Sequence, residues 1–330
     1  MNRFALFWLP QLTATALALA AAPLLMGWIN QCRAWLQNRS GAGVLRPYRV
    51  LRKLLHKDAV IARRASVLFR LAPYVQFGCM VLAVSIVPSI ATDVPLSRAA
   101  DVIALVGLLA LARVFMALAA MDVGTAFGSL GARREMLLAA LAEPALLMVF
   151  FTPALMSGST ALGTIVADIA EAHFSIYPSL AFAAAAFVMV LLAENARIPI
   201  DNPATHLELT MIHEAMTLEY SARHLAVIEL AHALKLMVYF LIGIALFVPY
   251  GIAAAGDWHA LPLATLALAV KLIAAGAGLA VLETVSAKVR IFRAPEFLAT
   301  AFLLAVLGML IHFHLESALP APEVRIESAP

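Results

Sequence analysis

The sequence is poor in charge and in cysteine, and each shortage excludes a class of protein. Only 13% of its 330 residues are charged, whereas a soluble domain has about 25%. With 63% hydrophobic residues and a mean hydropathy of +0.93, the chain has too little polar surface to cover a water-soluble particle. Its two cysteines, Cys32 and Cys79, lie far apart without a C-x-x-C pair, so the sequence supports neither a disulfide framework nor an iron–sulfur site.

Motifs for nucleotide binding and hydrolysis are also missing. The sequence contains no G-x-G-x-x-G, P-loop or G-x-S-x-G pattern. The net charge of +3 does not indicate nucleic acid, because the basic residues fall between apolar runs. His206 and His213 could approach one metal ion, but no H-E-x-x-H motif or cysteine pair accompanies them. We therefore expect no metal in this chain.

Long apolar runs dominate the sequence and predict membrane-spanning helices, because open sheet edges cannot lie in lipid. We expect an all-α polytopic membrane protein of about eight spans, with residues 1–330 forming a single integral membrane domain. The predicted spans are Phe4–Trp28, Val67–Ile90, Ala99–Ala120, Glu135–Ser157, Leu180–Arg197, Leu225–Tyr250, Leu261–Glu283 and Pro295–Glu316. The first run is not typical of a signal peptide, since its basic flank follows it.

Lysine and arginine are distributed unevenly between the connections. Sixteen fall in connections that share one side of the predicted bundle, and three fall on the other side. The positive-inside rule therefore places both termini outside, in the periplasm, and the basic connections in the cytoplasm. The chain is expected in a bacterial inner membrane as a multi-pass protein, with the lipid bilayer around it.

The first cytoplasmic connection, residues 31–66, is the most basic stretch of the chain. Its turn-like Gly41–Gly43, followed by Pro47 and the sequence LRKLLHKD at 51–58, predicts an interfacial amphipathic helix. The positive-inside rule alone would also explain its charge.

A polar segment interrupts the apolar sequence between two late spans. It reads ENARIPIDNPATHLELTMIHEAMTLEYS from Glu194 to Ser221. Pro199 and Pro203 should end the preceding helix near Arg197 and allow a short helix to start near Pro203. Spacing of three and four residues would place one face of that helix at Glu208, Met211, Ile212, Ala215 and Glu219. Residues 194–223 would either dock a partner protein or form an ordinary solvated loop.

Charged residues also fall within the predicted spans, where burying each costs about 2.5–3.5 kcal/mol. Glu229, His232 and Lys235 are spaced by three and form a stripe that could pass protons along the sixth span. Glu143 precedes Pro144, whose break in the helix can hold water. Structural ion pairs are the alternative interpretation. The proton-route candidates are Glu143, Glu229, His232, Lys235 and Glu283.

Two motifs carry a resemblance to a known family. The pattern E-x-x-R-x-P-x-D-x-P…E-Y-S resembles the signature of the complex I membrane subunit beside the quinone chamber, and here it consists of Glu194, Arg197, Pro199, Asp201, Pro203 and Glu219–Ser221. The first connection is similar to that family's G-x-L-Q-P…K-L-L-x-K-[ED] element at Gly43, Leu45, Pro47, Lys53–Leu55 and Lys57–Asp58. The usual E-G-E after the second proline is replaced by Ala204–His206. The version at Asp201–Glu214 is similar to the membrane subunits of formate hydrogenlyase and hydrogenase-4.

The hydrogenase resemblance implies a set of partners and site residues. The partners would be hydrogenase large and small subunits, an iron–sulfur protein and antiporter-like membrane subunits. The [NiFe] centre and iron–sulfur clusters would lie on those partners, and this chain would hold no cofactor or catalytic redox centre. The loss of E-G-E places a quinone in doubt. Residues lining the junction with the soluble arm would be Glu194, Arg197, Asp201, Glu208, Glu214 and Glu219. Glu143 and Glu229 would begin the proton route.

Three functions therefore remain open. The first is a membrane-anchor and ion-coupling subunit of a hydrogenase complex, which Asp201–Glu214 favours. The second is the equivalent subunit of a quinone-reducing NADH or formate oxidoreductase. The third is a stand-alone secondary transporter, although no matching pair of interrupted helices indicates inverted repeats.

Overall fold

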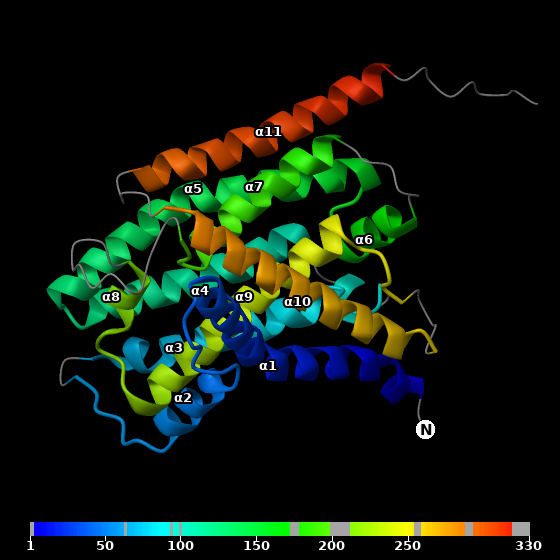
Figure 1. Cartoon of the computed structure of the whole chain (residues 1–330). Coiled ribbons are helices and arrows are strands. Elements are labelled where there is room, and N and C mark those ends of the chain that lie inside the picture. Colours follow the sequence, from blue (N-terminus) through cyan, green and yellow to red (C-terminus); the bar gives the residue numbers. More distant parts are fainter. Residues whose placement is uncertain are drawn as a thin grey trace, which may run out of the picture.

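The structure, a computed structural model, describes residues 3–62, 65–92, 95–98, 101–171, 178–198, 212–253, 259–287 and 293–318. These residues form helices joined by short connections, with isolated bridges but no strand within the described ranges (Figure 1). The helices are α1 (Arg3–Leu36), α2 (Arg46–Leu55), α3 (Val67–Ile86), the 3-10 helix η1 (Pro95–Arg98), α4 (Val102–Asp122), α5 (Ala126–Ser157), α6 (Leu162–Glu171), α7 (Pro178–Glu194), α8 (His213–Thr217), α9 (Ala222–Phe247), α10 (Leu261–Val285) and α11 (Ala294–Ala318). The predicted all-α membrane fold is confirmed.

Among the described residues, seven helices are long and apolar enough to cross a membrane, namely α1, α3, α4, α5, α9, α10 and α11. The fifth predicted span, Leu180–Arg197, corresponds to α7, which has 17 residues and is about 25 Å long. It ends at Glu194, beside Lys235 of α9. Lys235 lies about 20 Å along α9 from Ala222. Helix α7 is therefore short because it ends deep inside the bundle.

The helix that contains the fourth predicted span begins nine residues before Glu135. Helix α5 begins at Ala126, where the Thr125 hydroxyl accepts a hydrogen bond from the Gly128 amide at 3.3 Å. This N-cap starts the helix in a stretch whose glycines and arginines resemble a loop. Glu135 therefore lies inside α5 and is buried.

One end of the bundle carries α2, α8 and the described residues of the polar segment, and we call it the polar end. The connections that carry most of the lysine and arginine residues contact one another at this end. The Ser66 amide donates to Asp122 at 2.8 Å, and Val60 bonds to Ser221. Helix α6 lies at the opposite end (Figure 1), and the short η1 contacts it there. That the polar end faces the cytoplasm remains a prediction from the positive-inside rule.

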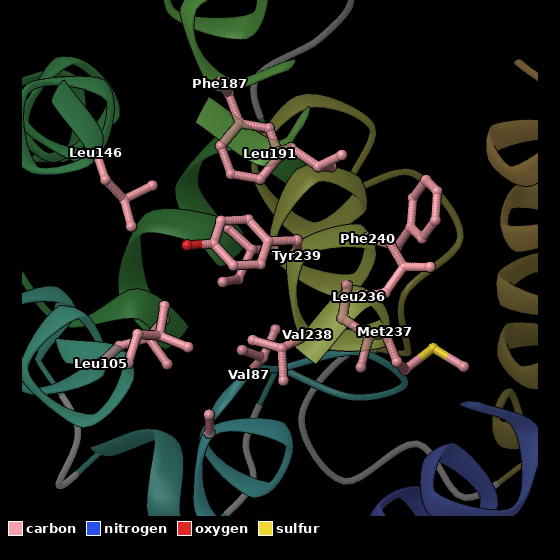
Figure 2. Close-up of a cluster of buried hydrophobic side chains, with 14 of the residues drawn as sticks. Val87, Leu105, Leu146, Phe187, Leu191, Leu236, Met237, Val238, Tyr239 and Phe240 are labelled. Carbon is pink, nitrogen blue, oxygen red and sulfur yellow. The ribbon is translucent and has the colours of Figure 1, made fainter. Parts of the chain in front are cut away.

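Helix α9 forms the centre of the core and is the most buried of the candidate spans. Figure 2 shows Tyr239 of α9 among Phe187 and Leu191 of α7, with Leu146 of α5 nearby. Helix α11 packs on α7 and α5, and α10 packs mainly on α1 (Figure 1).

Helix α2, within the predicted basic connection, is fastened to α1. The Tyr48 hydroxyl donates to the Ala20 carbonyl, and the Gly43 amide donates to Gln31 Oε1 at 3.1 Å. Pro47 lies in the first turn of α2, where a missing amide hydrogen does no harm. None of the α2 side chains is buried within the chain, and a position at the membrane interface remains a prediction.

Gly27 permits this close contact between α1 and the connection. A β-carbon at Gly27 would lie 1.9 Å from the Val44 carbonyl oxygen. A larger residue at this position would therefore force the backbone of α1 or of the connection to move. We expect Gly27→Ala to lower the free energy of unfolding by about 1–3 kcal/mol, measured by thermal unfolding in detergent. Gly78→Ala in α3 is the matched control, because nothing lies within 4 Å of its added methyl group. Equal free energies of unfolding for Gly27→Ala and Gly78→Ala would show that the contact between Gly27 and Val44 is not tight.

Candidate functional site

Arg113 of α4 is the centre of a group of charges buried among the spans. Only 7% of the residue is exposed. Its guanidinium lies 2.8 Å from Glu143 Oε1 and 2.5 Å from Glu194 Oε2, and its Nε lies 3.5 Å from Glu135 Oε1. Helices α5 and α7 supply these carboxylates, so one arginine joins three helices.

Lys235 and His213 extend the group to α9 and α8. Lys235 Nζ lies 3.0 Å from Glu194 Oε2, and His213 Nδ1 lies 3.2 Å from Glu135 Oε2. We define the buried charge cluster as Arg113, Glu135, Glu143, Glu194, His213 and Lys235. Arg113 and Lys235 as cations face three carboxylates, which leaves one excess negative charge when the His213 imidazole is neutral. A single bound proton would neutralise the cluster, and low dielectric makes that neutralisation favourable.

A cavity of about 490 Å³ opens at the polar end between α1, α2, α7, α8, α9 and α10. Part of its wall is apolar, from Pro23, Met26, Pro47, Val50, Leu51 and Leu236. Its charged and imidazole side chains are Arg33, Arg46, Glu194, Arg197, His213, Glu214, Glu229, His232, Lys235 and Glu283. The cavity therefore reaches the buried charge cluster directly through Glu194, His213 and Lys235.

A second cavity of about 20 Å³ shares His213, Thr217, His232 and Lys235 with the large cavity as lining residues. It is lined by Gln76 of α3, Arg113 and Glu135, and also by His232 and Lys235. The buried Gln76 Oε1 has no hydrogen-bond partner among the described residues. This volume and this polar lining suit one internal water molecule.

Glu283 of α10 forms a separate ion pair at the rim of the large cavity. Its carboxylate lies 3.0 Å from Arg197 Nη1 and 3.4 Å from Arg33 Nη1. The Arg197 guanidinium also reaches the Met26 sulfur at 2.7 Å. Glu283 is only 3% exposed. It thus joins α10 to α1 and to the chain just after α7.

The candidate residues of the polar segment fall into different places. Glu194 belongs to the buried charge cluster, Arg197 binds Glu283, and Glu214 lines the large cavity. Asp201 and Glu208 lie outside the described residues, as do His206 and Met211. The predicted helical face extending to Glu219 is wrong, because α8 covers only His213–Thr217 and a turn follows it.

The stripe of Glu229, His232 and Lys235 is present on α9, and all three residues line the large cavity. Lys235 nevertheless bonds to Glu194 of α7 rather than continuing the stripe. His232 instead lies edge-on to His213, with ring centroids 5.8 Å apart. Both proposed roles of these charges, ion pairing and proton passage, thus involve residues from several helices.

Tyr220 and Ser221 of the E-Y-S motif have a structural position. The Tyr220 ring stacks on Phe69 at 4.0 Å, and its hydroxyl donates to the Phe69 carbonyl at 2.9 Å. Burial raises the pKa of Tyr220, so this phenol stays protonated. The Ser221 hydroxyl donates to the Val60 carbonyl at 2.7 Å. The motif therefore fixes the first connection against the start of α9.

Sequence reasoning missed Glu135 and His213 as site residues and left Arg113 without a role. Arg113 carried a signal, because a buried arginine within a span requires carboxylates. Its partners could not be chosen from the sequence, since Glu143 and Glu194 lie 30 and 81 residues away. His213 lies in a polar segment, where a histidine ordinarily faces water.

These features define a polytopic membrane subunit with a buried charge cluster beside a large cavity. A profile of the NADH dehydrogenase family matches residues 10–314, and the chain belongs to that family. The chain is 32% identical over 289 residues to formate hydrogenlyase subunit 4 of Escherichia coli K12, covering 88% of this chain and 93% of that protein. It is 33% identical over 241 residues to hydrogenase-4 component C of the same organism, covering 73% and 75% of the two chains.

The fold is also found in a solved structure. A chain in the membrane-bound sulfane sulfur reductase, an archaeal respiratory membrane complex, matches with a TM-score of 0.79 and 22% identity. The match covers 92% of this chain and 99% of that chain. The resemblance drawn from the motifs is thereby confirmed. With seven apolar helices and relatives that are components of membrane complexes, the chain is a multi-pass inner-membrane protein of such a complex.

Proposed function

We propose that the chain is the membrane-anchor and ion-coupling subunit of a [NiFe]-hydrogenase complex of the formate hydrogenlyase or hydrogenase-4 type. The observation that carries the proposal is the buried charge cluster, which begins at the large cavity and continues through Arg113 to Glu143. Ionisable groups at membrane depth are costly and mark ion pathways. The two relatives from E. coli support the hydrogenase branch.

The soluble arm would bind at the polar end. Hydrogenase large and small subunits and an iron–sulfur protein would carry the [NiFe] centre and the clusters there. Cys32 and Cys79 are buried on separate helices, α1 and α3, so they suit packing rather than cluster ligation. A change in charge within the large cavity would then act on Glu194 and Lys235, which face it.

Antiporter-like membrane subunits would cover the face around Glu143. The Glu143 side chain is 35% exposed, and it is not one of the described residues that line the large cavity. A carboxylate facing lipid at that depth costs about 2.5–3.5 kcal/mol. A neighbouring subunit with a protonatable side chain would remove this cost and accept the ion. Glu143 would therefore be the exit from this subunit.

The proposal is tested by mild-detergent purification of the chain with its partners, nickel assay and reconstitution in liposomes. We expect nickel, a hydrogenase large subunit and proton or sodium movement coupled to hydrogen turnover. Glu143→Gln should reduce ion movement per turnover by about tenfold or more, because the amide cannot carry a proton. The control is Glu296→Gln, an exposed carboxylate at the start of α11. Unchanged ion movement in Glu143→Gln would contradict this route.

The large cavity favours a second candidate, a subunit of a quinone-reducing NADH or formate oxidoreductase. Its volume of about 490 Å³ and its apolar wall at Pro23, Met26 and Leu236 suit a ring-shaped ligand. Bound quinone with NADH- or formate-oxidising partners, and no nickel, would establish this alternative. Purification of the chain alone with transport activity would instead support a secondary transporter.

A further inference from the structure

Helix α8 is held against α5 by close backbone contact. A β-carbon at Gly131 of α5 would lie 2.9 Å from both the Ala215 β-carbon and the Ile212 carbonyl oxygen. Met216 packs with Ala132 of α5 and with two alanines of α4. Gly131 therefore lets α8 approach closely enough to insert His213 between the helices.

His213 is one of four described residues at the boundary between the two cavities, with Thr217, His232 and Lys235. It lines the large cavity and the small one, and 17% of its side chain is exposed. Its Nδ1 contacts Glu135, which lines the small cavity and is not among the described lining residues of the large one. Glu135 also contacts Arg113, which cannot give up its proton. Of these two partners, only His213 can therefore deliver a proton to Glu135.

We propose that His213 carries protons between the large cavity and Glu135, which deepens the ion-coupling function proposed above. A proton from the cavity binds at Nε2, and the Nδ1 proton passes to Glu135 Oε2. The N–H bond at Nδ1 breaks as the O–H bond forms, leaving a neutral imidazole and a neutral carboxyl group. The transferred proton cancels the excess negative charge of the buried charge cluster. Glu135 becomes a carboxylate again when the proton moves on.

Other charged groups around His213 belong to every helix packed against it. They are Glu135 of α5, Arg113 of α4, His232 and Lys235 of α9, and Glu214 of α8. His232 lines both cavities, and its ring centroid lies 5.8 Å from that of His213. It can pass a proton toward Nε2 directly or through water. The Glu135 carboxylate, which contacts Nδ1, then attracts the proton from His213 toward the buried charge cluster.

The test compares His213→Gln with His224→Gln in the reconstituted complex. His224 is another buried histidine, but it is not among the described lining residues of either cavity. His213→Gln keeps a donor for Glu135 yet cannot relay a proton, so we expect ion movement per turnover to fall to about one tenth of the wild-type value or less, with the complex still assembled. Wild-type coupling in His213→Gln would overturn the proposal.

A second measurement separates a proton carrier from a structural hydrogen bond. Glu135→Gln keeps an oxygen that can accept the hydrogen bond from His213 Nδ1 but cannot take up a proton. A structural hydrogen bond would leave ion movement per turnover at the wild-type level in this variant, whereas we expect about one tenth of that level or less. Wild-type ion movement in Glu135→Gln would overturn the proposal even if His213→Gln failed to assemble. A wild-type complex that moves no ions would instead refute the proposed function.

Discussion

Arg113→Leu is expected to lower the free energy of unfolding by about 3–5 kcal/mol, because it leaves buried carboxylates without their central cation. Glu143 would lose the partner at 2.8 Å, and Glu194 would keep only Lys235. Leucine fills part of the volume but offers no donor to these oxygens. The loss is measured by chemical or thermal unfolding of the purified complex in detergent. Ion movement should fall with it, since the cluster would take up protons to neutralise itself.

Two companion variants make this result specific to the buried charge cluster. Arg70→Leu removes an exposed arginine from α3 and should change the free energy of unfolding by less than about 0.5 kcal/mol. Adding Glu143→Gln to Arg113→Leu should recover part of the loss, because one uncompensated charge disappears. If Arg113→Leu unfolded like Arg70→Leu, the contacts of Arg113 would have no net stabilising effect.

The spans could be predicted from the sequence because the hydrocarbon core of the bilayer requires a long apolar run for each of them. Hydropathy depends on neighbours along the chain, so it finds α4 and α9 without tertiary information. The start of α5 could not be predicted this way, since its first turns contain glycines and arginines that resemble a loop. The short length of α7 also could not be predicted from the sequence. Its end is set by Glu194 meeting Lys235 and Arg113 inside the bundle.

In the polar segment, too, neighbouring residues in the sequence predict the end of a helix but not the contacts with distant residues. Two prolines predicted a helix end near Arg197, and α7 ends three residues earlier at Glu194. The role of Arg197 followed from Glu283, which is 86 residues away. The sequence marked Glu283 as charged and near the end of a span, yet only packing joins it to Arg33 and Arg197.

Glu283→Ala is expected to loosen α10 from α1, because Arg33 and Arg197 would lose their shared carboxylate. Hydrogen bonds to charged groups contribute about 1.5–3 kcal/mol each when buried, and Arg33 is 33% exposed, so we expect about 2 kcal/mol in total. Two attachments that would remain are the packing of Gly276 against α1 and the bond from Trp28 to the Ile273 carbonyl at 3.0 Å. Neither supplies charge compensation at the polar end.

The native cysteines report this opening. Cys32 is 8% exposed and lies on the α1 face that includes Leu25 and Ile29, both of which pack against Gly276 of α10. Separation of α10 should speed maleimide labelling of Cys32 by about tenfold or more, since 1.4 kcal/mol is a factor of ten. Cys79 of α3 is the internal reference and should not change. Glu296→Ala is the matched variant, and equal Cys32 labelling in the two variants would show that Glu283 does not hold α10 in place.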